Sequence, residues 1–259
     1  MNDYSVKDLA LAGVAWEITD VPSALRAKWA AAQTAPTTQT NTQTPNQNNP
    51  NTGPSVVPPI APVSTVTVET VESMASRPTD IDNLIRMIGD FNHPLRSAAT
   101  RVVFPNIAKN PNGLVILTDI PGAEDDATGN ILSGGAGDLL DKMLAAIGMS
   151  RDSVSIVPVV FWRTPGGRTP SENEISLVRP FTLRLIEFLK PRVILTLGQT
   201  AAQFIADIKL AGNHGKVCET KSGIPVMPIY HPNYLLLKPS AKREVWDALQ
   251  QLQNMLKIQ

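Results

Sequence analysis

The stretch LVILTDIPGAEDDATGNILSGGAG, residues 114–137, carries the signals that decide the fold. Its first four residues form an apolar run that indicates a buried strand, and Asp119 stands just beyond that run, followed at once by a Pro-Gly turn. A glycine cluster at 133–137 then opens onto an amphipathic segment, so the stretch is typical of a strand, a loop and a helix. Ligands of open α/β sheets bind at the carboxyl ends of strands, so we expect the functional site in this loop.

The chain that follows residue 78 alternates between strand and helix signals. Short β-branched runs join the first strand, and amphipathic patterns separate and follow them: strands are expected at 114–117, 154–160, 193–197 and 226–229, and helices at 135–148, 171–190, 199–210 and 241–256. Such alternation is typical of βαβ units. We therefore predict a three-layer α/β/α domain over residues 78–259, with a four-stranded parallel sheet.

The first 77 residues differ from this pattern. Residues 1–33 carry apolar side chains at near-helical spacing and predict a short N-terminal helical segment. Residues 34–77 are rich in Thr, Gln, Asn and Pro, and such a composition cannot bury enough apolar surface to offset its ordering entropy. We predict a disordered linker there, and a helical module on such a tether suits docking to a protein partner.

Composition narrows the class of protein. The 23 basic and 23 acidic residues cancel, so only local basic patches could attract nucleic acid, and an apolar fraction of 42% is enough for a globular core. A single cysteine, Cys218, excludes an intramolecular disulfide and any Cys-only metal or iron–sulfur site within one chain. The N-terminus lacks a signal-peptide pattern, and no apolar run reaches the roughly 18 residues of a membrane span. We expect a soluble, cytoplasmic protein.

The loop at 118–137, at the carboxyl end of the first predicted strand, carries groups that could take part in catalysis or binding. Asp119, beside the turn of Pro121 and Gly122, could orient a water or stabilise a developing cation, or it could simply cap the turn. The glycine cluster could bring backbone N–H groups close to a phosphate, or serve only tight packing, because it fits neither the Walker nor the dinucleotide pattern.

The segment HPNYLLLKPSAKR, residues 231–243, combines an imidazole, an aromatic ring, leucines and cations. In a protein that handles DNA, apolar side chains can wedge into the base stack while cations hold the flanking phosphates. The alternative is an ordinary loop with a structural histidine. Arg163 and Arg168 in the loop at 162–170 could contact phosphates or be solvated, and motifs of serine hydrolases and zinc enzymes are missing.

In their order along the chain, these motifs resemble the uracil-DNA glycosylase superfamily, most closely its family 4, the iron–sulfur type. That family carries a Gly-Glu-Ala-Pro-Gly motif, an acidic pair, Gly-x-Pro-Phe and a glycine-rich helix start, in register with residues 119–144. Its later elements resemble VVFWRTPGGRTP at 159–170, KPRVILTLGQTAA at 190–202 and YHPNYLLLKPSAKREVWDAL at 230–249. The similarity covers about residues 80–257.

The resemblance implies a monomeric enzyme of base-excision repair that binds duplex or single-stranded DNA, flips out a damaged base and hydrolyses its N-glycosidic bond. Asp119 would position the attacking water, and His231 would hydrogen-bond the departing base. The residues implied for the base pocket are Ile120, Pro121, Gly122, Leu132 and Pro158. Those implied for DNA binding are Gly134, Gly135, Arg163, Arg168, Asn233, Tyr234, Leu235, Lys238, Lys242 and Arg243.

The chain departs from the family at its cofactor. Family 4 holds a [4Fe–4S] cluster with four cysteines, and the corresponding positions fall near Asp90, His93, Trp162 and Val178, none of which is cysteine. We therefore expect no cluster, and no other metal or cofactor.

The base-reading positions depart from the family as well. The base-stacking phenylalanine aligns with Leu132, and the uracil-reading asparagine aligns with Pro158, which offers no amide to a pyrimidine. Asp119 replaces a glutamate and so has a shorter reach. Two hypotheses therefore stay open besides an unrelated small-molecule enzyme: a glycosylase for uracil or another deaminated base, and a degenerate member that binds DNA or a partner without catalysis.

Overall fold

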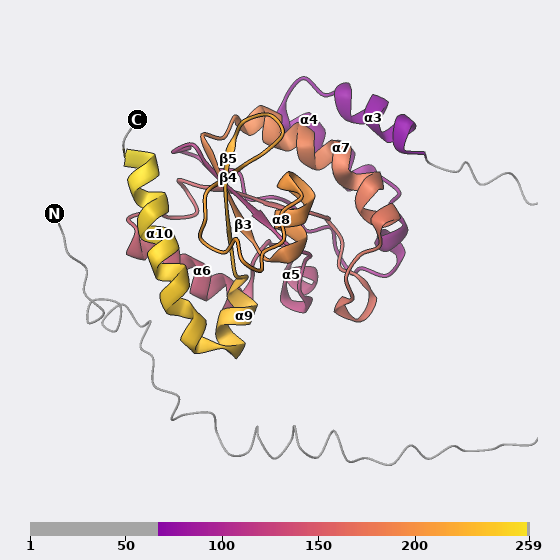
Figure 1. Ribbon diagram of the computed structural model, residues 1–259. Coiled ribbons are helices and arrows are strands. Elements are labelled where there is room, and N and C mark those ends of the chain that lie inside the picture. The colour runs from indigo at the N-terminus through magenta and orange to yellow at the C-terminus, as the bar shows by residue number, and fades with distance from the viewer. Residues whose placement is uncertain (1–66, 258–259) are drawn as a thin grey trace, which may run out of the picture. The chain divides into compact units, whose positions relative to one another are not determined.

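A computed structural model describes residues 67–257, which fold around one central sheet (Figure 1). The predicted segment 1–33 and most of the predicted linker lie outside the described residues. The predicted end of that linker, at residue 77, is wrong, because Val68–Ser76 form a helix, α3. Its buried residues, Val71 and Ala75, are spaced by one helical turn, and Thr67 caps its N-terminus. The polar composition before α3 hid this short amphipathic pattern.

The sheet has the strand order β2-β1-β3-β5-β4. Four of its strands are parallel, as predicted: β1 (Leu114–Thr118), β2 (Ser155–Pro158), β3 (Val193–Leu197) and β5 (Pro225–Ile229). A fifth strand, β4 (Cys218–Glu219), pairs antiparallel with β5 at the edge. The prediction of four strands missed β4, because two residues are too few to show an alternating pattern.

Helices cover both faces of the sheet, so the predicted three-layer α/β/α fold is confirmed (Figure 1). Besides α3, the helices are α4 (Ile81–Asp90), α5 (Ala123–Thr128), α6 (Gly134–Ala146), α7 (Glu172–Leu189), α8 (Gln199–Ala206), α9 (Pro232–Leu237) and α10 (Lys242–Lys257). Three short 3-10 helices lie in the loops: η2 (Pro94–Ser97), η3 (Pro165–Gly167) and η4 (Pro239–Ala241). None of the helices within residues 67–257 combines the length and the apolar character that a membrane span requires.

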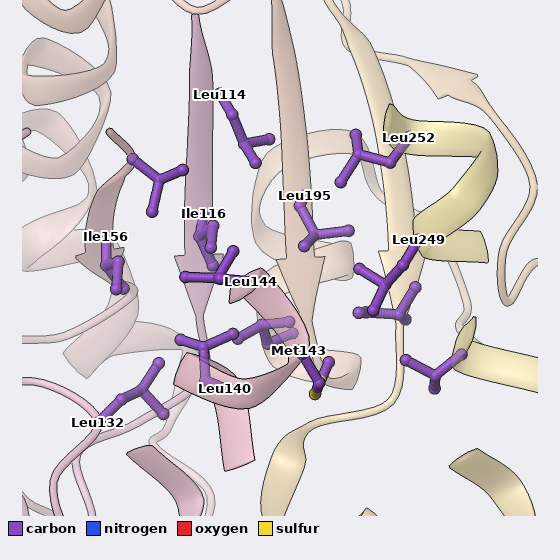
Figure 2. Packing of buried hydrophobic residues seen from close by; sticks show 14 of the residues in the cluster. Leu114, Ile116, Leu132, Leu140, Met143, Leu144, Ile156, Leu195, Leu249 and Leu252 are labelled. Atoms are coloured by element: carbon purple, nitrogen blue, oxygen red, sulfur yellow. The ribbon is translucent and has the colours of Figure 1, made fainter. Parts of the chain in front are cut away.

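Alternate residues of each strand face opposite layers and build two cores. Figure 2 shows the first core, where Leu114 and Ile116 of β1 lie with Leu140 and Leu144 of α6, while Leu249 and other residues of α10 cover the neighbouring strands. Burial of each such leucine contributes roughly 2 kcal/mol. Because a shift of one residue would move these side chains to the opposite core and disrupt the packing of both, the two cores fix the register and bring the carboxyl ends of the parallel strands to one edge.

The second core, on the opposite face, contains an aromatic cluster. We use "aromatic cluster" for Phe91, His93, Phe161, Trp162 and Phe181. His93 stacks on Trp162, with ring centroids 4.9 Å apart and planes 2° from parallel, and Phe91 meets Phe181 edge-on at 5.0 Å. Because its members come from before β1, after β2 and from α7, the cluster joins three distant parts of the chain.

Candidate active site

The carboxyl ends of β1 and β3 form the switch point of the sheet. The chain passes from β1 to β2 on one side and then returns to β3 on the other side of β1. Ligands of open α/β sheets bind at such a point. Thr118, the last residue of β1, pairs with Pro158 of β2 and with Leu197 of β3, which in turn pairs with Ile229 of β5. Residues directly beyond these strands therefore lie at one edge of the sheet.

Asp119 lies at this switch point, against the N-terminus of α8. The backbone N–H of Ala201 donates to its Oδ1 across 2.7 Å. Burial raises the pKa of Asp119 to about 6, although the backbone N–H groups of Ala201 and Thr200 act in the opposite direction. A carboxyl group with this pKa is mostly ionised at pH 7 and can accept a proton from a water, which suits a general base.

His231 follows the last parallel strand and caps α9. Its Nδ1 accepts a hydrogen bond from the backbone N–H of Asn233 at 3.1 Å, so the proton of the neutral ring must be on Nε2. Nε2 lies 3.2 Å from Oγ1 of Thr118, the residue before Asp119. Burial lowers the pKa of His231 to about 4, so the ring is neutral at pH 7. The structure thus brings both predicted catalytic residues to one edge and leaves His231 with a directed N–H donor.

The loop after Asp119 is held by Asp125, a residue that sequence reasoning did not assign to the site. Its carboxylate accepts hydrogen bonds from the N–H of Gly122 at 2.8 Å and from the N–H of Ser133 at 2.6 Å. One buried side chain therefore ties the start of the loop to its end. Asp126 accepts from the N–H of Thr100 at 2.8 Å and anchors the same short helix. An acidic pair that begins three residues after the glycine of a Pro-Gly turn was the available signal.

The predicted base pocket is only partly assembled. Ile120 is half-buried against the second core, Pro121 is buried, and Pro158 ends β2 beside Thr118. The structure does not bring Leu132 together with Ile120, because the Leu132 side chain is 3% exposed and packs in the first core, on the opposite face (Figure 2).

The backbone explains where Leu132 lies. Its φ of 51° is left-handed, and its carbonyl accepts from Arg151 Nη2 at 2.7 Å. The carbonyl carbon would lie 2.8 Å from a Cβ at position 137, so the close approach of the chain requires Gly137. The tight turn directs the side chain of Leu132 inward.

The predicted DNA-binding loops at α6 and α9 do lie side by side. Gly134 and Gly135 are exposed at the N-terminus of α6, and a Cβ at position 135 would lie 3.6 Å from Leu236 of α9. Leu235, predicted to contact DNA, is 1% exposed and packs in the first core, because the helical turn of α9 directs it inward. Its neighbours Leu236 and Leu237 are exposed instead, Leu237 by 86%.

Polar and charged residues surround these leucines. Asn233 and Tyr234 are exposed on α9, and the Nζ of Lys238 lies 5.9 Å from the Tyr234 ring. Arg243 is exposed in the first turn of α10. Lys242 beside it is half-buried, and burial, followed by the charge of Lys142, lowers its pKa.

The two arginines of the loop at 162–170 differ. Arg168, predicted to contact DNA, forms a two-fold ion pair with Glu174, at 2.7 Å and 2.6 Å. The Arg168 guanidinium holds the pKa of Glu174 at about 2, so this arginine supports the loop. Arg163 is half-buried and has no hydrogen bond or ion pair with any residue between 67 and 257, so it stays a candidate for phosphate contact.

The residues at the family's cluster positions do not fit an iron–sulfur cluster. Trp162 and Val178 are buried and offer no ligand atom, and Asp90 is exposed at the end of α4. Both ring nitrogens of His93 are already hydrogen-bonded. Within the described part of the chain, no group of three or more His, Cys, Asp or Glu residues could hold a metal ion.

Comparison with known proteins places this geometry in a family. The model of the uracil DNA glycosylase superfamily matches residues 104–253, more than half of the chain. The type-4 uracil-DNA glycosylase of Archaeoglobus fulgidus is 32% identical over 174 residues, which cover 63% of this chain and 87% of that protein. Those of Thermotoga maritima and Pyrobaculum aerophilum are each 34% identical, over 56% and 51% of this chain and 78% and 72% of theirs. The chain therefore belongs to the uracil-DNA glycosylase superfamily.

Proposed function

We propose that this protein is a DNA glycosylase of base-excision repair, which hydrolyses the N-glycosidic bond of uracil or another deaminated base flipped out of DNA. The observation that carries the proposal is that Asp119 follows β1 and His231 follows β5 at the carboxyl ends of the parallel strands, where His231 Nε2 lies 3.2 Å from the hydroxyl of Thr118, the residue preceding Asp119. The names of the type-4 relatives support the same reaction.

Each of the two side chains suits one part of this reaction. Ionised Asp119 orients a water toward the sugar carbon and takes its proton as the new C–O bond forms. The glycosidic C–N bond breaks, and the base leaves with the electron pair. The Nε2–H of His231 donates to the departing base as negative charge develops on it, and one such donor is typically worth about 10²–10³ in rate.

DNA binding is proposed for the surface formed by the first turn of α6 and by α9. Exposed Leu236 and Leu237 suit insertion into a base stack, and the exposed backbone at Gly134 and Gly135 suits a phosphate once the carboxylate of Glu124, which lies against Gly134, has rotated away. The candidates for further polar or ionic contacts are Arg163, Asn233, Tyr234, Lys238, Lys242 and Arg243. Because the chain has no net charge, the cations among these residues would supply the attraction to the DNA backbone.

Three finer proposals rest on sequence patterns and on the way such enzymes scan DNA. We infer that the protein acts as a monomer and works in the cytoplasm. We also infer that residues 1–33 dock a protein partner, because a short amphipathic segment precedes a long polar tether. Size-exclusion chromatography with light scattering, localisation of a tagged chain and pull-down with residues 1–33 would test these in turn.

A second function, DNA binding without catalysis, is favoured by the base-reading positions. Pro158 has no amide side chain to pair with a pyrimidine edge, and Leu132 packs in the first core. A site that lacks its polar readers loses most of its discrimination between bases.

Base release from a panel of oligonucleotides separates the two functions. Duplexes and single strands carrying uracil, hypoxanthine or xanthine are incubated with the full chain and with Asp119→Ala. We expect release of at least one base by the wild type and none by the variant. Absence of release across the panel, together with duplex binding that weakens as salt rises, would establish the non-catalytic function instead.

A further inference from the structure

Gly198 lies between β3 and α8, at the switch point of the sheet. Its N–H donates to the carbonyl of Ile229 at 2.9 Å, which fixes it to the end of β5. Its φ of 98° and ψ of 176° fall in a region that is essentially restricted to glycine. As the N-cap of α8 it has no side chain to accept a hydrogen bond from the first turn of that helix.

The carboxylate of Asp119 fills the place that a side chain at position 198 would take. A Cβ there would lie 2.5 Å from Cγ of Asp119 and 2.8 Å from Oδ1, and closer still to Oδ2. In that position Oδ1 accepts the N–H of Ala201, which is completely buried. The carboxylate of Asp119, in the loop after β1, therefore fills the space left by the missing side chain of Gly198 and accepts a hydrogen bond from the first turn of α8.

We propose that Gly198 and the first turn of α8 are positioning residues for Asp119, holding its carboxylate where it can orient the attacking water. The catalytic meaning of this inference rests on the proposed glycosidic hydrolysis. Backbone N–H groups at a helix N-terminus stabilise an anion and hold it in one orientation, so Asp119 does not need a cationic partner to fix it. Misplacement of a catalytic group by about 1 Å can cost about 100-fold in rate, so the positions of Gly198 and the first turn of α8 should determine the activity of Asp119.

The position of the Asp119 carboxylate can be disturbed without substituting Asp119 itself. Gly198→Ala adds a methyl group where the carboxylate lies. The matched control is Gly223→Ala, because Gly223 also has a positive φ, 79°, but a Cβ there meets nothing within 4 Å. We expect base release to fall by about 100-fold in Gly198→Ala and to change little in Gly223→Ala. Equal rates in the two folded variants would overturn the inference.

A measurement that needs no activity keeps the inference testable if Gly198→Ala does not fold or if the proposed function fails. In the wild type, the Ala201 amide should titrate in NMR spectra with a midpoint near pH 6, the pKa of Asp119. We expect no such titration in Asp119→Asn, and hydrogen exchange of this amide about 10-fold faster in Asp119→Ala than in Asp119→Asn, which keeps an acceptor. If the Ala201 amide neither titrates near pH 6 nor exchanges faster in Asp119→Ala, the proposed positioning of Asp119 by α8 is wrong, whether or not the wild type releases a base.

Discussion

Two His-Pro turns in this protein have the same local geometry and opposite surroundings. His93-Pro94 begins η2 and His231-Pro232 begins α9, and each histidine is the N-cap. In both, Nδ1 accepts the backbone N–H two residues further on, from Leu95 at 3.2 Å and from Asn233 at 3.1 Å. This turn fixes the neutral ring with its proton on Nε2 in both places.

The two turns differ in what Nε2 meets. In His93, 1% exposed and stacked on Trp162, it donates to the backbone carbonyl of Glu174 at 2.9 Å. In His231, half-buried at the strand ends, its one hydrogen-bond partner among residues 67–257 is the hydroxyl of Thr118. The main-chain carbonyl of Glu174 is fixed in the backbone, whereas the hydroxyl of Thr118, a residue that is 3% exposed, belongs to a side chain that can rotate and leave Nε2 to a substrate oxygen. The dipeptide therefore fixes the tautomer, and the surroundings decide between packing and chemistry.

Of the two turns, the one at His231 should give the larger effect. His231→Ala removes the directed donor, so base release should fall by up to about 1,000-fold, while the loss of the α9 cap lowers the free energy of unfolding by only about 1 kcal/mol. Single-turnover release from the best substrate of the panel, together with urea denaturation, measures both. If His231→Ala kept the wild-type rate, His231 would have no role in catalysis and both His-Pro turns would be structural.

At His93 the expected effect is on stability. His93→Ala loses the stack on Trp162, leaves the carbonyl of Glu174 without its donor and opens a cavity, so the free energy of unfolding should fall by about 3 kcal/mol. His93→Phe keeps a ring beside Trp162 and should lose less. Base release per folded molecule should match the wild type in both variants, and a specific loss of rate would show that this turn also acts in catalysis.

Asp119 extends the contrast to the pH dependence of stability. Its folded-state pKa, about 6, lies above its ordinary value of 3.8, so its contribution to stability is fully present below about pH 4 and is lost as the pH rises through 6. Asp119→Asn resembles the protonated form and should raise the free energy of unfolding at pH 8 by about 1 to 2 kcal/mol, with no gain at pH 4. Wild-type base release should rise with pH through about 6. Denaturation midpoints and rates between pH 4 and 8 test both statements.

Arg168 should behave as part of the His93 region, because Glu174 joins the two. The carbonyl of Glu174 accepts from His93, and its carboxylate, with a pKa of about 2, pairs with Arg168. Arg168→Gln should lower the free energy of unfolding only slightly, since the arginine is 48% exposed and solvent screens its ion pair. The loss should shrink as the pH falls from about 4.5 to 2, where the depressed pKa of Glu174 lets it become protonated.

The same substitution at Arg163, the other arginine of this loop, tests DNA binding when it is compared with Arg168→Gln. It should weaken duplex affinity and reduce the salt dependence, whereas Arg168→Gln should leave both nearly unchanged. A larger effect on DNA affinity from Arg168→Gln would return that residue to the DNA-binding surface.

Features set by local patterns were predictable from the sequence, and features set by tertiary packing were not. Apolar runs gave the four parallel strands and the switch-point carboxylate, because buried parallel strands need continuous apolar residues. Alignment by motif could not show that Leu132 turns inward, since this depends on a left-handed residue, on Gly137 and on Arg151 from a distant loop. The ion pair of Arg168 was equally hidden, because a loop arginine gives no sign of its partner.

The smallest expected effect concerns the acceptor that distinguishes His231 from His93. Thr118→Val removes the hydroxyl that His231 Nε2 meets, so the N–H loses its partner and the free energy of unfolding should fall by about 1 kcal/mol. Thr196 offers a matched control on the neighbouring strand, because its buried Oγ1 has no hydrogen-bond partner among residues 67–257. Thr196→Val should therefore leave stability unchanged or raise it slightly.

The ring of His231 reports the same change directly. The ¹⁵N shift of Nε2 should move in Thr118→Val, return in Thr118→Ser and stay constant in Thr196→Val, while the His93 signals are unaffected in all three. His93 cannot be tested in this way, because its acceptor is a main-chain carbonyl that no side-chain substitution removes. If Thr118→Val and Thr196→Val change stability and the His231 signals equally, the hydroxyl of Thr118 does not accept a hydrogen bond from His231. The two histidines then differ only in their exposure to solvent.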